Sequence, residues 1–158
     1  MFGAFCINLV IGAQFAWGNF APYIVGYYRG LGYDVFMNTF YLILPLMILT
    51  STFVWPLGMY LSEKFGSRIV ILIGGMIVVS SVMLASISTH TSSFFAYYAI
   101  GFGIGKGFLY PAPLLAGWSH LPGRKGLVSG IIVSGLGVGA FFFGILAQKL
   151  VNPDNIPP

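Results

Sequence analysis

Charged side chains are scarce in this sequence. Only 10 of its 158 residues are charged, seven Lys or Arg and three Asp or Glu, which is 6% of the chain. Soluble domains carry about 25% charged residues. A soluble fold with 58% hydrophobic residues could not cover its apolar surface with so few charges. The same composition excludes intrinsic disorder. It predicts a protein embedded in a lipid bilayer.

Cysteine is almost absent as well. The single Cys6 excludes an internal disulfide and a cysteine-rich metal site. The sequence contains no nucleophile–base set, no paired carboxylates and no metal-ligand spacing, so we expect no enzyme, no metal and no cofactor. The net charge of +4 comes from scattered basic residues, which do not form a patch that would bind nucleic acid.

Long apolar runs divide the chain into five segments of the length that a membrane-spanning helix requires, about 20 residues. They are continuously apolar rather than alternating, which favours helices over barrel strands. We therefore expect an all-α membrane bundle of about five transmembrane helices. This domain covers residues 1–150, and residues 151–158 form a terminal tail. The predicted spans are 2–27, 36–61, 69–88, 94–118 and 127–150.

The basic residues predict an orientation. Lys64 and Arg68 precede the third span, and Arg124 and Lys125 precede the fifth, so these two connections share one side of the membrane. The positive-inside rule places that side, and the N-terminus, in the cytoplasm or a matrix-like compartment. We expect the mature chain to start near Met1, because the first apolar run is longer than a signal-peptide core and no basic residue precedes it.

The connection before the third span contains an acid, a base, a glycine and a second base. They are Glu63, Lys64, Gly66 and Arg68. This order and spacing resembles the charged loop of the major facilitator superfamily (MFS), in which the loop is thought to latch two halves of the transporter together. The sequence departs from the pattern at three points. It has Glu63 where an aspartate is usual, Ser67 at a position that is usually basic, and a leading glycine one residue earlier than in the pattern. Ordinary anchoring by positive charges is the alternative interpretation.

A second stretch supports the same resemblance. Arg124 and Lys125 are followed by regularly spaced glycines, a pattern similar to the fifth helix of oxalate/formate antiporters and monocarboxylate transporters. The stretch 14–19 in the first span is weakly similar to the same group. The resemblance implies helices one to five of the N-terminal half of such a transporter. It also implies transport of small organic anions, mono- or dicarboxylates, by alternating access.

Small residues four apart predict close helix packing, since they let backbones approach in lipid. The glycines expected to pack in this way are Gly101, Gly105, Gly126, Gly130, Gly135 and Gly139. A faint internal repeat also relates the first and fourth spans and pairs Gly12 with Gly103. Such a relation is expected where a transporter half is built from two inverted repeats.

Lys106 is a charged residue near the middle of an apolar span. It lies 12 residues from either end of the fourth span, roughly 18 Å along a helix, and a central lysine costs about 2.5–3.5 kcal/mol. The three acids, Asp34, Glu63 and Asp154, all fall in predicted loops. Three explanations remain open: an anionic ligand in a wet cavity, a partner carboxylate or lipid headgroup, or a lysine kept neutral by desolvation.

An anion bound at Lys106 would also contact neighbouring side chains. Tyr110 lies one turn later on the same helical face. Asn8, Phe15 and Asn19 share a face of the first span, as expected of a cavity lining. These five residues are the candidate substrate-binding set. Interhelical hydrogen bonding is the alternative role for the polar ones.

The number of spans leaves two functions open. Alternating access moves two six-helix halves around a central site, and five helices cannot enclose such a site. The chain is therefore part of a secondary transporter for small organic anions, or a transport-inactive, transporter-derived structural subunit of a larger membrane complex. In both cases the expected partners are the lipid bilayer and further protein subunits that complete or cover the bundle, and not nucleic acid.

Overall fold

The computed structural model describes residues 1–151, with side chains up to residue 150, as helices joined by short turns. In chain order they are α1 (Phe2–Gly12), the 3₁₀ segment η1 (Ala13–Ala16), α2 (Trp17–Gly30), α3 (Met37–Tyr41), α4 (Ile43–Phe65), α5 (Ser67–Ile87), α6 (Thr91–Phe94), the π-helical segment η2 (Phe95–Gly101), α7 (Phe102–Leu109), α8 (Pro111–His120), the 3₁₀ turn η3 (Pro122–Arg124) and α9 (Lys125–Val151). The predicted all-α membrane bundle is confirmed. Residues 152–158 of the predicted tail lie outside the described residues.

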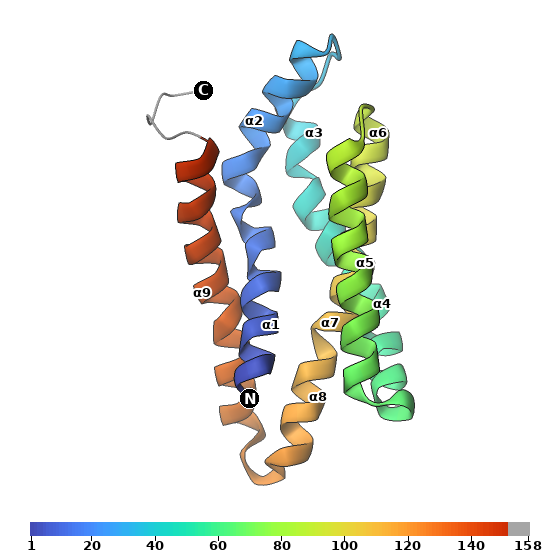
Figure 1. Ribbon diagram of the computed structural model, residues 1–158, viewed down its shortest axis with the longest axis vertical. Helices are drawn as coiled ribbons and strands as arrows, with labels where there is room; N and C mark the ends of the chain where they lie inside the picture. The colour runs from blue at the N-terminus through green and yellow to red at the C-terminus, as the bar shows by residue number, and fades with distance from the viewer. Residues whose placement is uncertain (152–158) are drawn as a thin grey trace.

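The helical segments line up into five columns that run the length of the bundle (Figure 1). The columns are α1–η1–α2, α3–α4, α5, α6–η2–α7–α8 and α9. Each column contains one predicted span. The N-terminus lies at the same end as the α4–α5 and α8–α9 connections, and α9 finishes at the other end (Figure 1).

Four of these columns are long and apolar enough to cross a membrane: Phe2–Gly30, Met37–Phe65, Ser67–Ile87 and Pro122–Leu150. The protein is therefore a multi-pass membrane protein. The remaining column, which contains the expected span 94–118, is less apolar, because Lys106, several glycines and two prolines lower its hydropathy. It lies among the other columns, so less of its surface has to be compatible with lipid.

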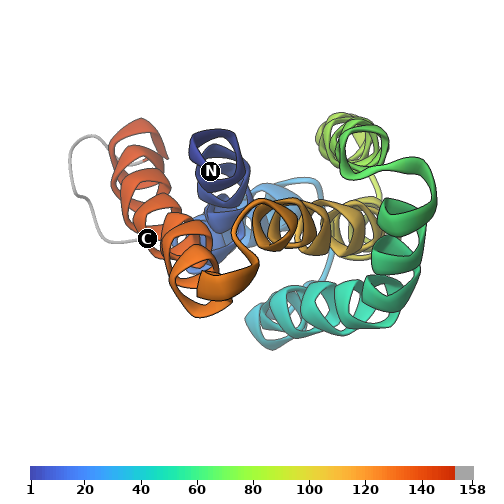
Figure 2. The ribbon, with the colours of Figure 1, turned by 90° about the horizontal axis from the view of Figure 1, so that it is seen from below.

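The position of this column is clear from below the bundle (Figure 2). It runs between α1 and α9 on one side and α4 and α5 on the other. Every residue of α7 except Ile104 is buried. A Cβ atom added to Gly105 would lie 2.6 Å from Val78 Cγ2, and one on Gly103 would lie 2.8 Å from Thr50 Cβ. The small residues of α7 therefore allow α4 and α5 to approach its backbone closely.

A break divides the central column one turn beyond Lys106. Pro111 has no N–H group to donate to the carbonyl oxygen one turn earlier, although Tyr110 itself keeps helical dihedral angles of φ −76° and ψ −50°. Accordingly α7 ends at Leu109 and α8 begins at Pro111. The Tyr110 N–H still donates to the Lys106 carbonyl at 2.9 Å, so the column bends without coming apart.

The internal repeat has a structural counterpart. A Cβ on Gly12 would collide with the Leu136 carbonyl oxygen of α9, and one on Gly103 would lie 2.9 Å from the Met47 carbonyl oxygen of α4. The first column thus packs on α9 as the central column packs on α4. Gly135 also lies in this contact, because its Cβ would lie 2.6 Å from the Phe5 carbonyl oxygen.

The other predicted packing glycines differ among themselves. Added Cβ atoms on Gly101 and Gly139 would collide with Ser81 Oγ and with the Leu9 carbonyl oxygen. Around Gly126 and Gly130 no atom lies within 4 Å of an added Cβ. These two glycines therefore face away from the described helices.

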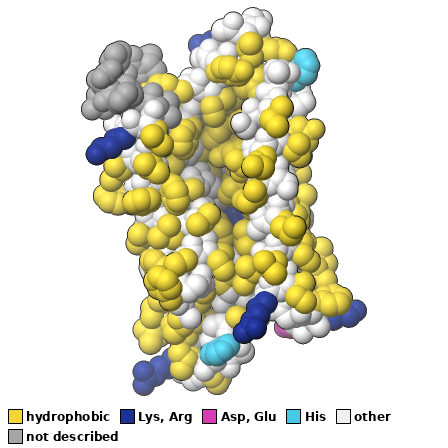
Figure 3. Space-filling model, in the orientation of Figure 1, with side chains coloured by type: hydrophobic (Ala, Val, Ile, Leu, Met, Phe, Trp, Pro, Cys, Tyr) yellow, Lys and Arg dark blue, Asp and Glu magenta, His cyan; other side chains and the backbone are white. Residues whose placement is uncertain are grey.

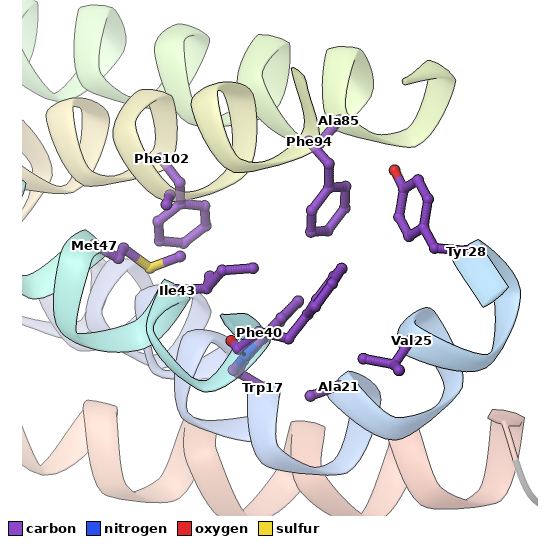
Figure 4. Packing of buried hydrophobic residues seen from close by; sticks show 11 residues of the cluster. Trp17, Ala21, Val25, Tyr28, Phe40, Ile43, Met47, Ala85, Phe94 and Phe102 are labelled. Atoms are coloured by element: carbon purple, nitrogen blue, oxygen red, sulfur yellow. Dashed lines mark hydrogen bonds between the residues drawn. The ribbon is translucent and has the colours of Figure 1, made fainter. Parts of the chain in front are cut away.

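A cluster rich in aromatic residues joins four columns at the end of the bundle where α2 finishes (Figure 4). Trp17 of α2 packs among Phe40 and Phe94, and its Nε1–H donates to the Phe40 carbonyl oxygen at 3.0 Å. The Tyr28 hydroxyl donates to the Ser88 carbonyl oxygen at 3.1 Å. These contacts hold α2 against the starts of the second and fourth columns.

Candidate functional site

Lys106 is buried at the middle of the bundle, with 7% of its surface exposed. Within residues 1–150 its ammonium group makes no hydrogen bond or ion pair. The two acids in this part of the chain do not compensate it, because Asp34 lies in the turn after α2 and Glu63 in the last turn of α4. The structure therefore places a cation in the apolar interior without a counter-charge from the described chain.

Tyr110 lies beside Lys106, as predicted from their spacing. The two residues are one turn apart on the same face of the central column. The Tyr110 ring stacks on the indole of Trp55 in α4, with ring centroids 4.8 Å apart and planes inclined by 3°. The structure thus places Trp55 of α4 against Tyr110, which lies one helical turn from Lys106 in the central column.

Trp55 is not among the binding residues predicted from the sequence. Its indole Nε1 atom is buried and has no hydrogen-bond partner within the described residues. A tryptophan in an apolar span gives no sequence signal for this role, because only the packing of α4 on α7 and α8 shows which residues it faces.

The predicted residues of the first column lie elsewhere. Asn8 is fully buried against α9, and its Nδ2–H donates to the Ala4 carbonyl oxygen at 3.1 Å. The Asn19 Nδ2–H donates to the Gly144 carbonyl oxygen of α9 at 3.3 Å. Phe15 is 46% exposed. Asn8 and Asn19 therefore both lie against α9, and the 3₁₀ segment η1 interrupts the regular helix between them.

Gln14 of η1 is a second buried polar residue that was not among the predicted site residues. It is 1% exposed, and neither its amide nitrogen nor its amide oxygen has a partner within the described residues. It borders a hollow of about 230 Å³ that Phe102 and Tyr98 also line. The sequence signal that could have identified Gln14 is that it is a polar residue within an apolar span.

The charged connections lie at the ends of the bundle (Figure 3). Glu63 and Lys64 finish α4, and Gly66 makes the turn with φ of +87°, a conformation that favours glycine. Arg68 lies in the first turn of α5. The Lys64 ammonium lies over the rings of Tyr60 and Phe65, at 5.9 and 5.5 Å from their centroids.

The second basic pair lies at the same end of the bundle. Arg124 finishes η3 and Lys125 starts α9. Between the two ends, the view of Figure 3 shows mainly hydrophobic side chains, with a Lys or Arg side chain visible in the central hollow. The arrangement matches a protein most of whose charges lie at the two membrane surfaces.

An apolar groove separates α1 from α5. Two hollows of about 550 and 340 Å³ adjoin along it, both lined by Ile7 and Ile71. Phe102 and Leu109 of α7 line the inner part, and Arg68 lies at the outer end. Lys106 is not among the residues that line either hollow.

Comparisons with known proteins identify similar transporters. The chain is 26% identical to the apicoplast pyruvate carrier 1 of Toxoplasma gondii over 196 aligned positions, which cover 100% of this chain and 35% of the carrier. It is 35% identical to monocarboxylate transporter 13 of Rattus norvegicus over 99 residues, 61% of this chain and 23% of the transporter. An MFS-type transporter of Aspergillus fumigatus is 26% identical over 64% of this chain and 23% of its own length.

No family model and no solved structure matches the chain. The chain spans about a third of the length of the pyruvate carrier and less than a quarter of the length of the other two relatives. These relatives are transporters, which agrees with the resemblance seen in the sequence motifs. The chain therefore resembles part of a major facilitator transporter of the monocarboxylate transporter type.

Proposed function

We propose that this protein forms part of a secondary transporter of small organic anions, with a carboxylate bound at Lys106 and Tyr110. The observation that carries the proposal is the buried ammonium of Lys106, which has no partner within the described residues. A lysine at the centre of a bilayer is unfavourable by about 2.5–3.5 kcal/mol. An anionic ligand offsets this cost, and the lysine in turn attracts the ligand into an apolar region.

The names of the relatives indicate the class of anion. One is called a pyruvate carrier and others are called monocarboxylate transporters. A single lysine supplies one positive charge, which matches one carboxylate. We therefore favour monocarboxylates over dicarboxylates as ligands of this part of the transporter.

Transport by alternating access requires more protein than these five columns. Such transporters rock two bundles about a central site, so further polypeptide has to cover the face that Lys106 and Tyr110 share. In this proposal Glu63, Lys64, Gly66 and Arg68, with Arg124 and Lys125, contact that polypeptide at one membrane surface in one of the two conformations.

The buried Lys106, which has no partner within the described residues, is also consistent with a second function, that of a transport-inactive structural subunit of a larger membrane complex. In that case a carboxylate of a neighbouring subunit or a lipid headgroup would be the partner of Lys106.

The two functions differ in their response to Lys106→Met. We expect the reconstituted protein, together with any subunit that copurifies, to exchange labelled pyruvate in a counterflow assay. Lys106→Met should lower the rate at least tenfold, while Lys149→Met, which removes an exposed lysine at the end of α9, should leave it unchanged. A flat trace from correctly inserted wild-type protein contradicts transport and supports the structural subunit.

A further inference from the structure

Trp55 has a buried polar group that the fold leaves unpaired. Its indole Nε1 atom is shielded from solvent and has no acceptor within the described residues. The other two tryptophans differ, because the Nε1–H of Trp17 donates to the Phe40 carbonyl oxygen and that of Trp118 to Ser129 Oγ. A buried donor without a partner is unfavourable, more so in the membrane interior where water is scarce.

The surroundings of Trp55 supply further donors. Its ring stacks on Tyr110, and Tyr110 lies one turn from Lys106 on the same face of the central column. An indole ring with an unpaired N–H is therefore stacked on a phenol ring whose residue lies one helical turn from the lysine. Lysine and tryptophan can only donate hydrogen bonds, so the group that satisfies both has to be an acceptor, and the ammonium requires it to be negative.

We propose that Trp55 binds the carboxylate together with Lys106, donating its indole N–H to a carboxylate oxygen. This inference rests on the proposed function and adds a specificity-determining residue to it. The parallel stack on Tyr110 fixes the plane of the indole and thus the direction of its N–H. In this site the indole N–H of Trp55 orients the carboxylate, and the ammonium group of Lys106 supplies the positive charge that attracts it.

Trp55→Phe tests the role of the N–H group, since it keeps an aromatic ring against Tyr110 and removes the donor. We expect the dissociation constant for sodium pyruvate, measured by isothermal titration calorimetry on reconstituted protein, to rise about tenfold or more, as for a lost hydrogen bond to a charged group. Trp118→Phe is the matched control, because it removes an indole N–H that already donates to Ser129 Oγ, and it should leave the dissociation constant unchanged.

A measurement on the wild-type protein covers the case in which Trp55→Phe does not fold. The three indole N–H resonances can be assigned with Trp17→Phe and Trp118→Phe. Addition of pyruvate should move the Trp55 proton downfield, as expected when an N–H donates to a carboxylate, and the shift should be absent in Lys106→Met.

The outcomes separate this inference from the function on which it rests. Absence of pyruvate binding by the wild-type protein contradicts the proposed function. Binding that requires Lys106 but is equal in Trp55→Phe, with a stationary Trp55 resonance, overturns only the role of Trp55.

Discussion

At the scale of single residues, the structure separates buried polar groups that the fold satisfies from those that it does not. The Trp17 N–H and the Tyr28 hydroxyl donate to carbonyl oxygens of other columns, so they fasten helices together. Lys106, Trp55 and Gln14 have buried polar groups without partners in the described part of the chain. The first group serves stability, and the second contains the candidate ligands of a substrate.

Trp17→Phe should therefore destabilise the bundle without affecting pyruvate binding. The substitution removes the hydrogen bond to the Phe40 carbonyl oxygen and part of the packing in the aromatic cluster. Interhelical hydrogen bonds in membranes contribute about 0.6 kcal/mol on average and up to about 1.7, so we expect a loss of about 1 kcal/mol or more. Unfolding in sodium dodecyl sulfate, followed by circular dichroism, measures it. A midpoint equal to that of the wild type would show that this bond does not hold α2 in place.

At the scale of elements, glycine contacts decide how closely the columns approach. The central column presents small residues to both α4 and α5, and α9 presents Gly135 and Gly139 to α1. Packing of this kind replaces the hydrophobic force that joins helices in water. It also encloses Lys106, because α4 and α5 lie close to the α7 backbone on either side of it.

Gly139→Ala should separate α1 from α9, because the new Cβ would collide with the backbone carbonyl of Leu9, which cannot rotate away as a side chain could. We expect a destabilisation of about 1–3 kcal/mol, the usual cost of overpacking. Gly137→Ala, two residues away with no atom within 4 Å of its added Cβ, should be neutral. The midpoint of unfolding in sodium dodecyl sulfate compares them, and equal midpoints would refute the close α1–α9 contact.

At the scale of the whole molecule, two pairs of columns flank the central one, and charges lie at both ends of the bundle (Figures 2 and 3). The α4–α5 and α8–α9 connections, with four basic residues, lie at the same end as the N-terminus. An odd number of columns places the end of α9 at the opposite end (Figure 1). The orientation of this arrangement in a membrane is a prediction from the positive-inside rule.

Single cysteines test that orientation. In a Cys6→Ser background, Gly123→Cys in η3 and Thr89→Cys in the turn after α5 lie at opposite ends of the bundle. A membrane-impermeant maleimide added to intact cells with the protein in their plasma membrane should label residue 89 and not residue 123. Permeabilised cells should label both. Labelling of residue 123 alone in intact cells would show that the orientation is the opposite of the predicted one. Labelling of both residues in intact cells would show that they do not lie on opposite sides of the membrane.

The positions of the columns could be predicted from the local sequence. The residues of the candidate site could be predicted from it only in part. Each predicted span overlaps one column, because the length of an apolar run is a local property that the bilayer selects. Lys106 stands out by its charge and Tyr110 by its spacing. The position of Trp55 depends on how α4 rotates against the central column, which no local pattern records. The lateral position of Asn8 and Asn19 against α9 depends on the 3₁₀ segment η1, which the apolar pattern does not indicate.

The sequence by itself determined that this is an all-α membrane protein, where its apolar spans lie, and that Lys106 falls near the middle of one of them. Composition and hydropathy are sufficient for these conclusions, because lipid excludes unpaired backbone groups and isolated charges. Only the tertiary structure decided that the least apolar column is the central one and that Trp55 stacks on Tyr110. Those facts depend on contacts between helices far apart in the chain, and glycines set how closely these helices approach.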